Sequence, residues 1–178
     1  PAIDTRAEKQ MRWWAEHVGK ERLFQITGMP LHPMYTLNKL MWLRQHEPGI
    51  FAAAQRFLCM QDFVFHQLGL PPAMDYSLAA RTMAFDVARL TWSDEILDFA
   101  GMDATRFSKL LPSGTVVGEI PPAAAAALGL GQGVVAVTGG HDQPAGALGC
   151  GAIAAGISMD STGTVECVGV ASSRLVLD

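Results

Sequence analysis

An apolar run that ends in two glycines and then enters a helix restricts the fold of this chain more than any other segment. Val134–Val137 is continuously apolar and predicts a buried strand. Gly139-Gly140 interrupt that strand and allow the backbone to turn sharply. Asp142 follows where a helix is expected to begin, with Pro144 among its first residues. This order of strand, turn and helix predicts an α/β fold with Asp142 at the edge of a sheet.

Asp142 is the candidate general base of the chain. Open α/β sheets bind ligands at the carboxyl ends of their strands, and a carboxylate held there can take a proton from a substrate hydroxyl. Further along, Gly163-Thr164 combines a backbone that a ligand can approach closely with a hydroxyl donor, which suits a phosphate. From spacing alone two simpler interpretations stay open: Asp142 caps a helix, and Gly163-Thr164 forms a turn. A base and a phosphate-binding segment together indicate phosphoryl transfer to an alcohol.

The predicted elements are mainly helical at first and strand-rich toward the end. Apolar residues recur at helical spacing over residues 5–18. Asp75 or Ser77, and later Ser93, belong to the residue types that cap helices. Helices are therefore expected over residues 5–18, 37–45, 61–68, 94–100 and after Pro121-Pro122, short strands over 57–59 and 116–120, and a hairpin-like edge after residue 156.

Composition argues against several classes of partner. With 178 residues, 49% of them hydrophobic, the chain can bury one substantial core. Its net charge of −4 arises from scattered charges, which argues against nucleic acid or an anionic membrane as a partner. No apolar run reaches the ~18 residues that a transmembrane helix needs.

Cysteine and histidine do not group as they do in metal sites. The three cysteines are odd in number and form no C-x-x-C pair, which indicates buried, reduced thiols in a cytoplasmic protein. Four histidines form no ligand cluster, so no metal is assigned to protein side chains: His17, His32, His46 and His66. The four tryptophans are expected in the core: Trp13, Trp14, Trp42 and Trp92.

The stretch from Gly139 to Glu166 resembles the core signature of the FGGY carbohydrate kinases. In that family a G-x-D-Q/N-type motif carries the catalytic aspartate, and a later G-T-S/G-type motif approaches the nucleotide phosphates. Upstream segments similar to family motifs follow in the family's order across nearly all of the chain: Asp4-Thr5-Arg6-Ala7, Thr27-Gly28, Lys39–Leu43, Asp62-Phe63, Asp75–Ala79, Trp92-Ser93 and Gly118-Glu119-Ile120.

The resemblance implies an ATP-dependent kinase for a sugar or polyol hydroxyl, with the actin-like, ribonuclease H-like ATPase fold. It implies ATP and Mg²⁺ as cofactors, a small-molecule sugar or polyol and a second copy in a homodimer as partners, and no nucleic acid or membrane. The site residues that it implies are catalytic Asp142, substrate-binding Gln143 and Met34, and nucleotide-binding Gly163 and Thr164.

Two positions depart from the family pattern. No Trp precedes Asp4, where the family motif has one. Met34, five positions before Lys39, stands where several members place an aromatic or basic residue in the sugar pocket. Since methionine cannot donate a hydrogen bond, we expect a deoxy sugar or a polyol with one apolar face. His141 varies in the family, and a structural or supporting role is expected for it.

The family comparison also predicts that the chain is a fragment, inactive alone. Full-length members are longer and carry a D-x-G-T/S phosphate loop and a Gly-rich adenine-binding stretch, neither of which occurs here. Residues 1–152 are expected to be a helix-rich part of the N-terminal domain with an incomplete sheet, and residues 153–178 the start of the C-terminal nucleotide-binding domain. The alternative is a non-catalytic actin-fold module for binding or assembly. A third option, an acetate- or butyrate-type kinase, is disfavoured by the Asp75–Ala79 and Lys39–Leu43 matches.

Overall fold

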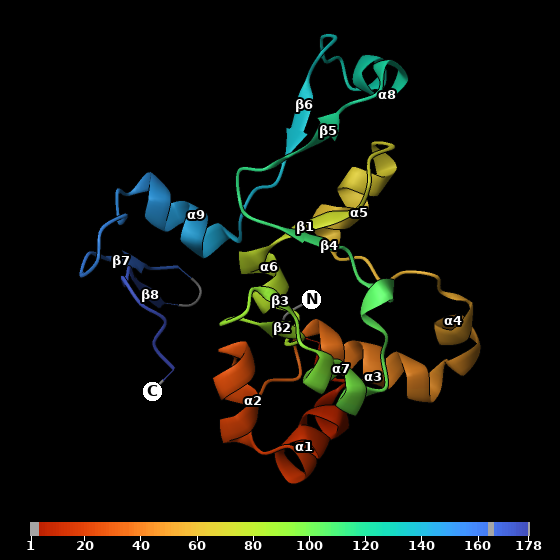
Figure 1. Cartoon of the computed structure of the whole chain (residues 1–178), viewed down its shortest axis with the longest axis vertical. Coiled ribbons are helices and arrows are strands. Elements are labelled where there is room, and N and C mark those ends of the chain that lie inside the picture. The colour runs from red at the N-terminus through yellow and green to blue at the C-terminus, as the bar shows by residue number, and fades with distance from the viewer. Residues whose placement is uncertain (1–3, 164–165, 178) are drawn as a thin grey trace.

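The computed structural model describes residues 4–163 and 166–177 (Figure 1). Its α/β architecture is helix-rich with small sheets, as expected. The helices are α1 Glu8–His17, α2 Lys20–Thr27, α3 Thr36–His46, α4 Pro48–Ala53, α5 Met60–Gln67, α6 Tyr76–Ala80, α7 Asp94–Ala100, α8 Pro122–Ala127 and α9 Asp142–Gly149. The strands are β1 Ala73–Asp75, β2 Phe85–Asp86, β3 Thr91–Trp92, β4 Lys109–Leu111, β5 Val116–Glu119, β6 Val135–Val137, β7 Ser158–Ser161 and β8 Cys167–Val170.

The main hydrophobic core lies where α1, α2, α3 and α7 meet (Figure 1). Each helix turns one apolar side inward, as amphipathic spacing predicts. All four helices contribute side chains that are almost completely removed from water: Trp14, Leu23, Leu37, Ile96 and Leu97. Burial of such side chains contributes about 1.5–3 kcal/mol each, so this cluster supplies much of the stability of the fold.

The tryptophan prediction is correct for two of the four residues. Trp14 and Trp92 are buried, and Trp92 Nε1 donates to Ser108 O at 3.0 Å. Trp13 and Trp42 are only half-buried. Each stacks instead on a histidine one turn later, with ring centroids 4.4 Å and 4.5 Å apart, because residues i and i+4 share a helix face.

Local capping signals place two helices as predicted. Asp75 Oδ1 accepts from the backbone nitrogens of Ser77, at 2.9 Å, and Leu78, at 3.3 Å, at the start of α6. Ser93 Oγ accepts from Ile96 N at 3.3 Å at the start of α7. These bonds satisfy N–H groups that the first turn of a helix leaves without partners.

The expected strand over residues 57–59 is wrong. The segment forms no strand, and Phe57 N donates instead to Arg106 O at 2.9 Å. The Phe57 ring stacks on Phe51 with centroids 5.1 Å apart and lies under the Arg106 guanidinium. Aromatic packing between distant segments fixes this stretch, which its local composition did not reveal. Helices α2 and α4 and strands β1 to β4 were also not predicted.

The strands pair only two at a time among the described residues. β1 and β4 are parallel with Asp75 opposite Leu111, and the other three pairs, β2–β3, β5–β6 and β7–β8, are antiparallel. The antiparallel pair β7–β8 confirms the hairpin-like edge expected after residue 156. The parallel pair lies between the helical core and the β5–β6 pair, and it delivers Asp75 to the start of α6 (Figure 1).

Strand β6 is correctly placed but less buried than expected. It pairs with β5, and of its three residues only Ala136 is buried, in a second apolar cluster with Phe65 and Ile120. Val135 and Val137 are 48% and 43% exposed, because they point away from that cluster. The continuous apolar run therefore does not mark a strand covered on both faces.

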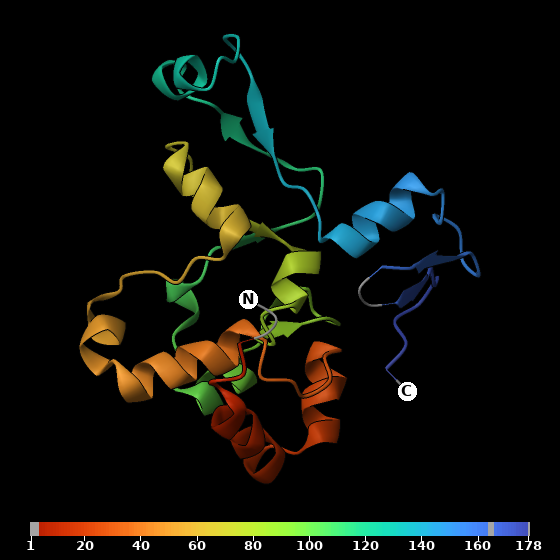
Figure 2. The same cartoon turned by 180° about the vertical axis from the view of Figure 1, so that it is seen from behind.

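Helix α9 and the β7–β8 pair form a lobe at the side of the molecule, which is clear from behind in Figure 2. Cys150, at the end of α9, is exposed, so the expectation that all three thiols are buried is wrong for this one. No helix within residues 4–163 and 166–177 is long and apolar enough to cross a membrane.

A buried carboxyl group in α5 predicts a pH-dependent stability. Asp62 is fully buried, its Oδ2 accepts from Ser108 Oγ at 2.5 Å, and its Oδ1 has no partner among the described residues. Burial raises the pKa of Asp62, because the charged form loses its hydration. The folded protein then binds a proton that the unfolded chain releases, so stability is highest below the unfolded pKa and falls as pH rises through the folded one.

We therefore expect the free energy of unfolding of Asp62→Asn to exceed that of the wild type at pH 8. The expected difference is about 1–3 kcal/mol, which is the usual cost of burying a polar group without a hydrogen-bond partner. The difference should shrink as pH falls toward the ordinary aspartate range, near pH ~4. Urea unfolding at several pH values measures this, with exposed Asp98→Asn as the control. A wild type that gains stability between pH 5 and pH 8 relative to Asp62→Asn would contradict the prediction.

Candidate functional site

The chain is fixed in place just before it reaches the predicted catalytic loop. Thr138 is buried, and its Oγ1 donates to Pro112 O at 2.7 Å and accepts from Thr115 N at 2.9 Å. Thr138 N also donates to Thr115 O at 2.9 Å. These bonds tie the end of β6 to the turn before β5, so the residues that follow leave from a defined point.

Gly139 and Gly140 form the open part of this loop. Neither has a positive φ, so the turn expected here does not depend on left-handed backbone. A Cβ on Gly140 would lie 3.6 Å from Ser77 Oγ, an ordinary contact distance. The glycines therefore leave the loop without side chains beside Asp142, and a ligand can approach its backbone.

Asp142 is the first residue of α9, as predicted, and its side chain is 81% exposed. Its Oδ1 accepts from Gln143 N at 2.8 Å, which orients the carboxylate at the helix start. The positive end of the helix dipole favours a negative charge at this place. An accessible carboxylate on a fixed helix start has the geometry that a base needs to accept a proton from a bound hydroxyl.

His141, and not Asp142, is the N-cap residue of α9. Its Nδ1 lies 2.9 Å from Asp142 Oδ1 and 3.4 Å from Gln143 N. The shorter contact is satisfied when Nδ1 carries the proton and donates to the carboxylate. His141 thus adds a second contact that orients Asp142, in line with the supporting role expected for it.

Gln143 lines a cavity of about 330 Å³ between α9 and the β7–β8 pair. Its Oε1 is buried and has no partner among the described residues. The rest of the lining is mostly apolar and includes Met159 and Val170. A buried acceptor without a partner favours a ligand that brings a hydrogen-bond donor, such as a hydroxyl group.

Met34 lies in a different part of the site region, on the segment before α3. Its Sδ is 4.0 Å from Arg81 Nη2, and Arg81 Nη1 is 3.9 Å from Met29 Sδ. The same guanidinium lies over the Tyr35 ring, 5.2 Å from its centroid. No hydrogen bond joins Met34 to Asp142 or Gln143 in the described structure. Arg81, which sequence reasoning missed, brings N–H donors to a position where Met34 has none.

Helix α6 links these two regions. Arg81 follows its last residue, and Ser77 in its first turn accepts a hydrogen bond from His141 N at 2.7 Å. The contact spans 64 positions in the chain. Local sequence patterns therefore gave no sign that α6 lies against the predicted catalytic loop.

The predicted nucleotide-binding residues lie after β7. Gly163 is exposed, and a Cβ there would meet no atom within 4 Å, so its backbone is accessible to a ligand. Thr164 lies outside the described residues. The nucleotide-binding role of both residues stays a prediction.

Within residues 4–163 and 166–177, no group of three His, Cys, Asp or Glu side chains is arranged to hold a metal ion. Mg²⁺ in phosphoryl-transfer sites commonly takes only one or two carboxylates and completes its shell with phosphate oxygens and water. A site of this kind therefore needs no cluster of three protein ligands.

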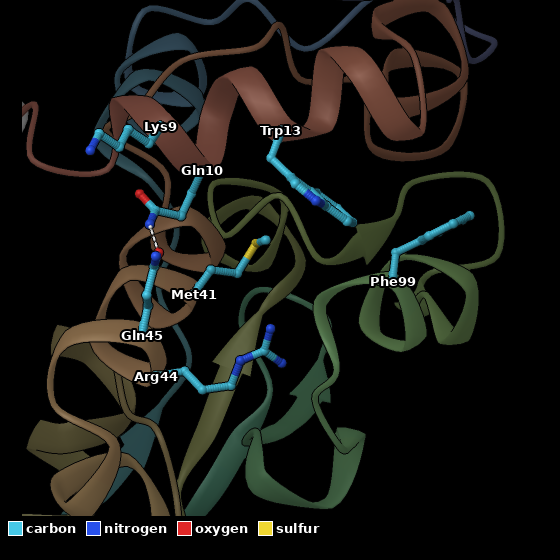
Figure 3. A pocket seen from close by; sticks show the side chains of 7 residues that line it. All are labelled: Lys9, Gln10, Trp13, Met41, Arg44, Gln45 and Phe99. Atoms are coloured by element: carbon cyan, nitrogen blue, oxygen red, sulfur yellow. Dashed lines mark hydrogen bonds between the residues drawn. The ribbon is translucent and has the colours of Figure 1, made fainter.

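A cavity of about 500 Å³ lies elsewhere, among α1, α3 and α7 (Figure 3). Gln10 Nε2 donates to Gln45 Oε1 at 2.9 Å on one side of it. On the other side Arg44 Nη1 donates to Ala100 O at 2.5 Å and Gly101 O at 3.1 Å, at the end of α7. None of the predicted site residues lines this cavity.

Comparison with known proteins identifies relatives of the whole segment. The chain is 35% identical over 167 residues to xylulose kinase of Klebsiella pneumoniae, covering 92% of this chain and 34% of that protein. It is 28% identical over 171 residues to gluconokinase of Bacillus subtilis strain 168, covering 92% of this chain and 33% of that protein. The chain therefore spans about a third of the length of the curated relatives it matches.

A similar structure has been solved. The crystal structure of xylulose kinase from Rhodospirillum rubrum superimposes with a TM-score of 0.90 at 25% identity, covering 98% of this chain and 36% of that one. The fold is thus the actin-like ATPase fold of the sugar kinases. The family model described as the N-terminal domain of the FGGY family of carbohydrate kinases matches residues 2–149. The chain belongs to the FGGY family of carbohydrate kinases.

Proposed function

We propose that the protein containing this chain transfers a phosphoryl group from ATP to a hydroxyl group of a sugar or polyol, with Asp142 as the general base. One observation carries the proposal: an exposed carboxylate is fixed at the start of α9 in a chain of the FGGY family, and the following residue, Gln143, has an Oε1 without a partner among the described residues. The carboxylate can accept a proton, and the amide can fix a neighbouring hydroxyl.

In the proposed reaction Asp142 orients the substrate hydroxyl and accepts its proton while the hydroxyl oxygen bonds to the γ-phosphorus. The bond from that phosphorus to the oxygen bridging the β- and γ-phosphates breaks, and this oxygen leaves on ADP. His141 and Gln143 N hold the carboxylate through its Oδ1. The base is therefore positioned before substrate arrives, which lowers the entropic part of the barrier.

The nucleotide and the metal ion complete the site. ATP provides the phosphoryl group, and bound Mg²⁺ would neutralise charge between the phosphates. We assign nucleotide binding to the exposed Gly163 backbone and to Thr164.

Residues 1–152 would belong to the N-terminal domain and residues 153–178 to the start of the C-terminal domain. We further propose a cytoplasmic homodimer, in which closure of the two domains excludes water from the reaction.

Substrate selection is assigned to Gln143 and to the region of Met34. Met34 offers an apolar surface, which favours a deoxy sugar or a polyol with one apolar face. Arg81, in contact with Met34, makes no ion pair with any described acidic residue and offers a positive charge to the same region. A sugar acid is therefore a second substrate class to test.

The test is ADP release from ATP and Mg²⁺ by the longest protein that contains this chain, with a ketopentose such as xylulose, a deoxyketose such as fuculose, and an aldonic acid such as gluconate. We expect release with at least one sugar, and none from this chain alone. A clear preference for the fully hydroxylated ketopentose would contradict the role given to Met34. No ADP release with any of the sugars, and no change in melting temperature with sugar or nucleotide, would favour a binding or assembly module.

A further inference from the structure

A buried polar cluster connects β1 to the catalytic loop. Asp75, the last residue of β1, is fully buried, and its Oδ1 accepts from Ser77 N at 2.9 Å and from the Ser77 hydroxyl. Its Oδ2 is buried without a partner among the described residues. On the other side, Asp75 N donates to Gln61 Oε1 at 2.9 Å. Asp75 is thus held from two sides, through its carboxylate oxygen Oδ1 and through its backbone N–H, and it cannot move without losing these hydrogen bonds.

The hydroxyl of Ser77 has a defined direction. Its hydrogen goes to Asp75 Oδ1, so its oxygen is left as an acceptor. That oxygen accepts from His141 N at 2.7 Å. His141 is the N-cap of α9 and precedes Asp142 directly. The chain of bonds therefore runs from the buried carboxylate of Asp75, through the Ser77 hydroxyl, to the backbone that carries the base.

The hydrogen bond from His141 N to Ser77 matters because little else holds the loop before α9. Gly139 and Gly140 have no side chains with which to fix it, and a Cβ at Gly140 would still leave 3.6 Å to Ser77 Oγ. Among the described residues, the bond from His141 N to Ser77 Oγ is the only hydrogen bond that ties the loop between Thr138 and α9 to the rest of the molecule. Its loss would leave the start of α9 free to shift.

We propose that Asp75 and Ser77 are positioning residues, which hold the His141 backbone and so place the carboxylate of Asp142 for proton transfer. The proposal rests on the proposed function, since it assigns them a task for the base Asp142. A displacement of about 1 Å at a reacting group can reduce the rate about 10²-fold. Because the Asp142 carboxylate accepts the proton in the transition state, while substrate binding is also assigned to the Met34 region, we expect the effect to fall on kcat more than on KM.

The test compares three variants of the longest protein that contains this chain. Ser77→Ala removes the link to His141 but keeps Asp75 as the cap of α6. Ser77→Thr keeps the hydroxyl. Ser113→Ala is the matched control, because Ser113 Oγ lies 3.5 Å from the same Asp75 oxygen and does not contact His141. We expect kcat to fall about 10–100-fold in Ser77→Ala, with KM changed less than about threefold, and Ser77→Thr and Ser113→Ala to stay near wild type.

Amide hydrogen exchange gives a readout that does not need catalysis. We expect about tenfold faster exchange in peptides covering residues 139–143 in Ser77→Ala only, because one hydrogen bond to the His141 amide is lost. Unchanged exchange in Ser77→Ala, or an equal increase in Ser113→Ala, would overturn the proposal whatever the activity. Faster exchange confined to Ser77→Ala, in a protein that phosphorylates no sugar, would support the link while contradicting the proposed function.

Discussion

Asp142→Asn is expected to abolish phosphoryl transfer while leaving the fold intact. Asparagine is nearly the same size and keeps an Oδ1 acceptor for Gln143 N and His141 Nδ1, so the start of α9 should be preserved. The amide cannot accept the substrate proton. Loss of a general base reduces the rate by typically 10²–10⁴-fold, and we expect the upper end because no second carboxylate contacts Asp142 among the described residues.

A matched control exists within the chain. Asp94 is also the first residue of its helix, α7, and is exposed, but α7 belongs to the helical core and lies apart from α9 (Figure 1). Asp94→Asn removes the same charge from the same helix position and should keep wild-type kcat. Coupled ADP release gives kcat, and melting temperature reports the fold. Asp142→Asn turning over at a rate within about tenfold of wild type would show that another group accepts the proton.

Local signals in the sequence predicted the helix ends well. Ser93 and Gly101 bound α7 where they were expected to, because a cap and a left-handed glycine act through the backbone of their own turn. The start of α9 at Asp142 was predicted from the Gly139-Gly140 break and from Pro144 in the first turn. Spacing alone left two roles open for Asp142, a helix cap and a catalytic base. The family resemblance favoured the base, and that role stays a prediction.

Contacts between distant segments could not be read from local patterns. Ser77 and His141 meet only because the parallel pair β1–β4 brings α6 against the loop after β6. Arg81 was missed because its neighbour Met34 lies 47 positions away. The exposure of Val135 was missed for the same reason. An apolar run shows that its residues prefer burial, but it does not show which neighbours cover them.

Gly101→Ala is expected to destabilise the fold by about 2–4 kcal/mol, more than an ordinary helix-end glycine would. Gly101 ends α7 with a φ of +64°, and its neighbour Met102 N donates to Leu97 O at 2.9 Å, which completes the helix end. An alanine there has a strained backbone. Its Cβ would also lie 2.2 Å from Arg44 Nη1, so the guanidinium must leave the carbonyl oxygens of Ala100 and Gly101.

Gly129→Ala separates the two effects. Gly129 ends α8 with a φ of +69° and the same bonding pattern, Leu130 N donating to Ala125 O at 2.8 Å, but a Cβ there meets nothing within 4 Å. It should show the backbone strain alone, about 1 kcal/mol. Urea unfolding gives both free energies. In an Arg44→Ala background, Gly101→Ala should fall to the Gly129→Ala value, because no guanidinium remains to be displaced. If Gly101→Ala keeps its full effect in that background, displacement of Arg44 is not its cause, and the packing around the end of α7 must be responsible.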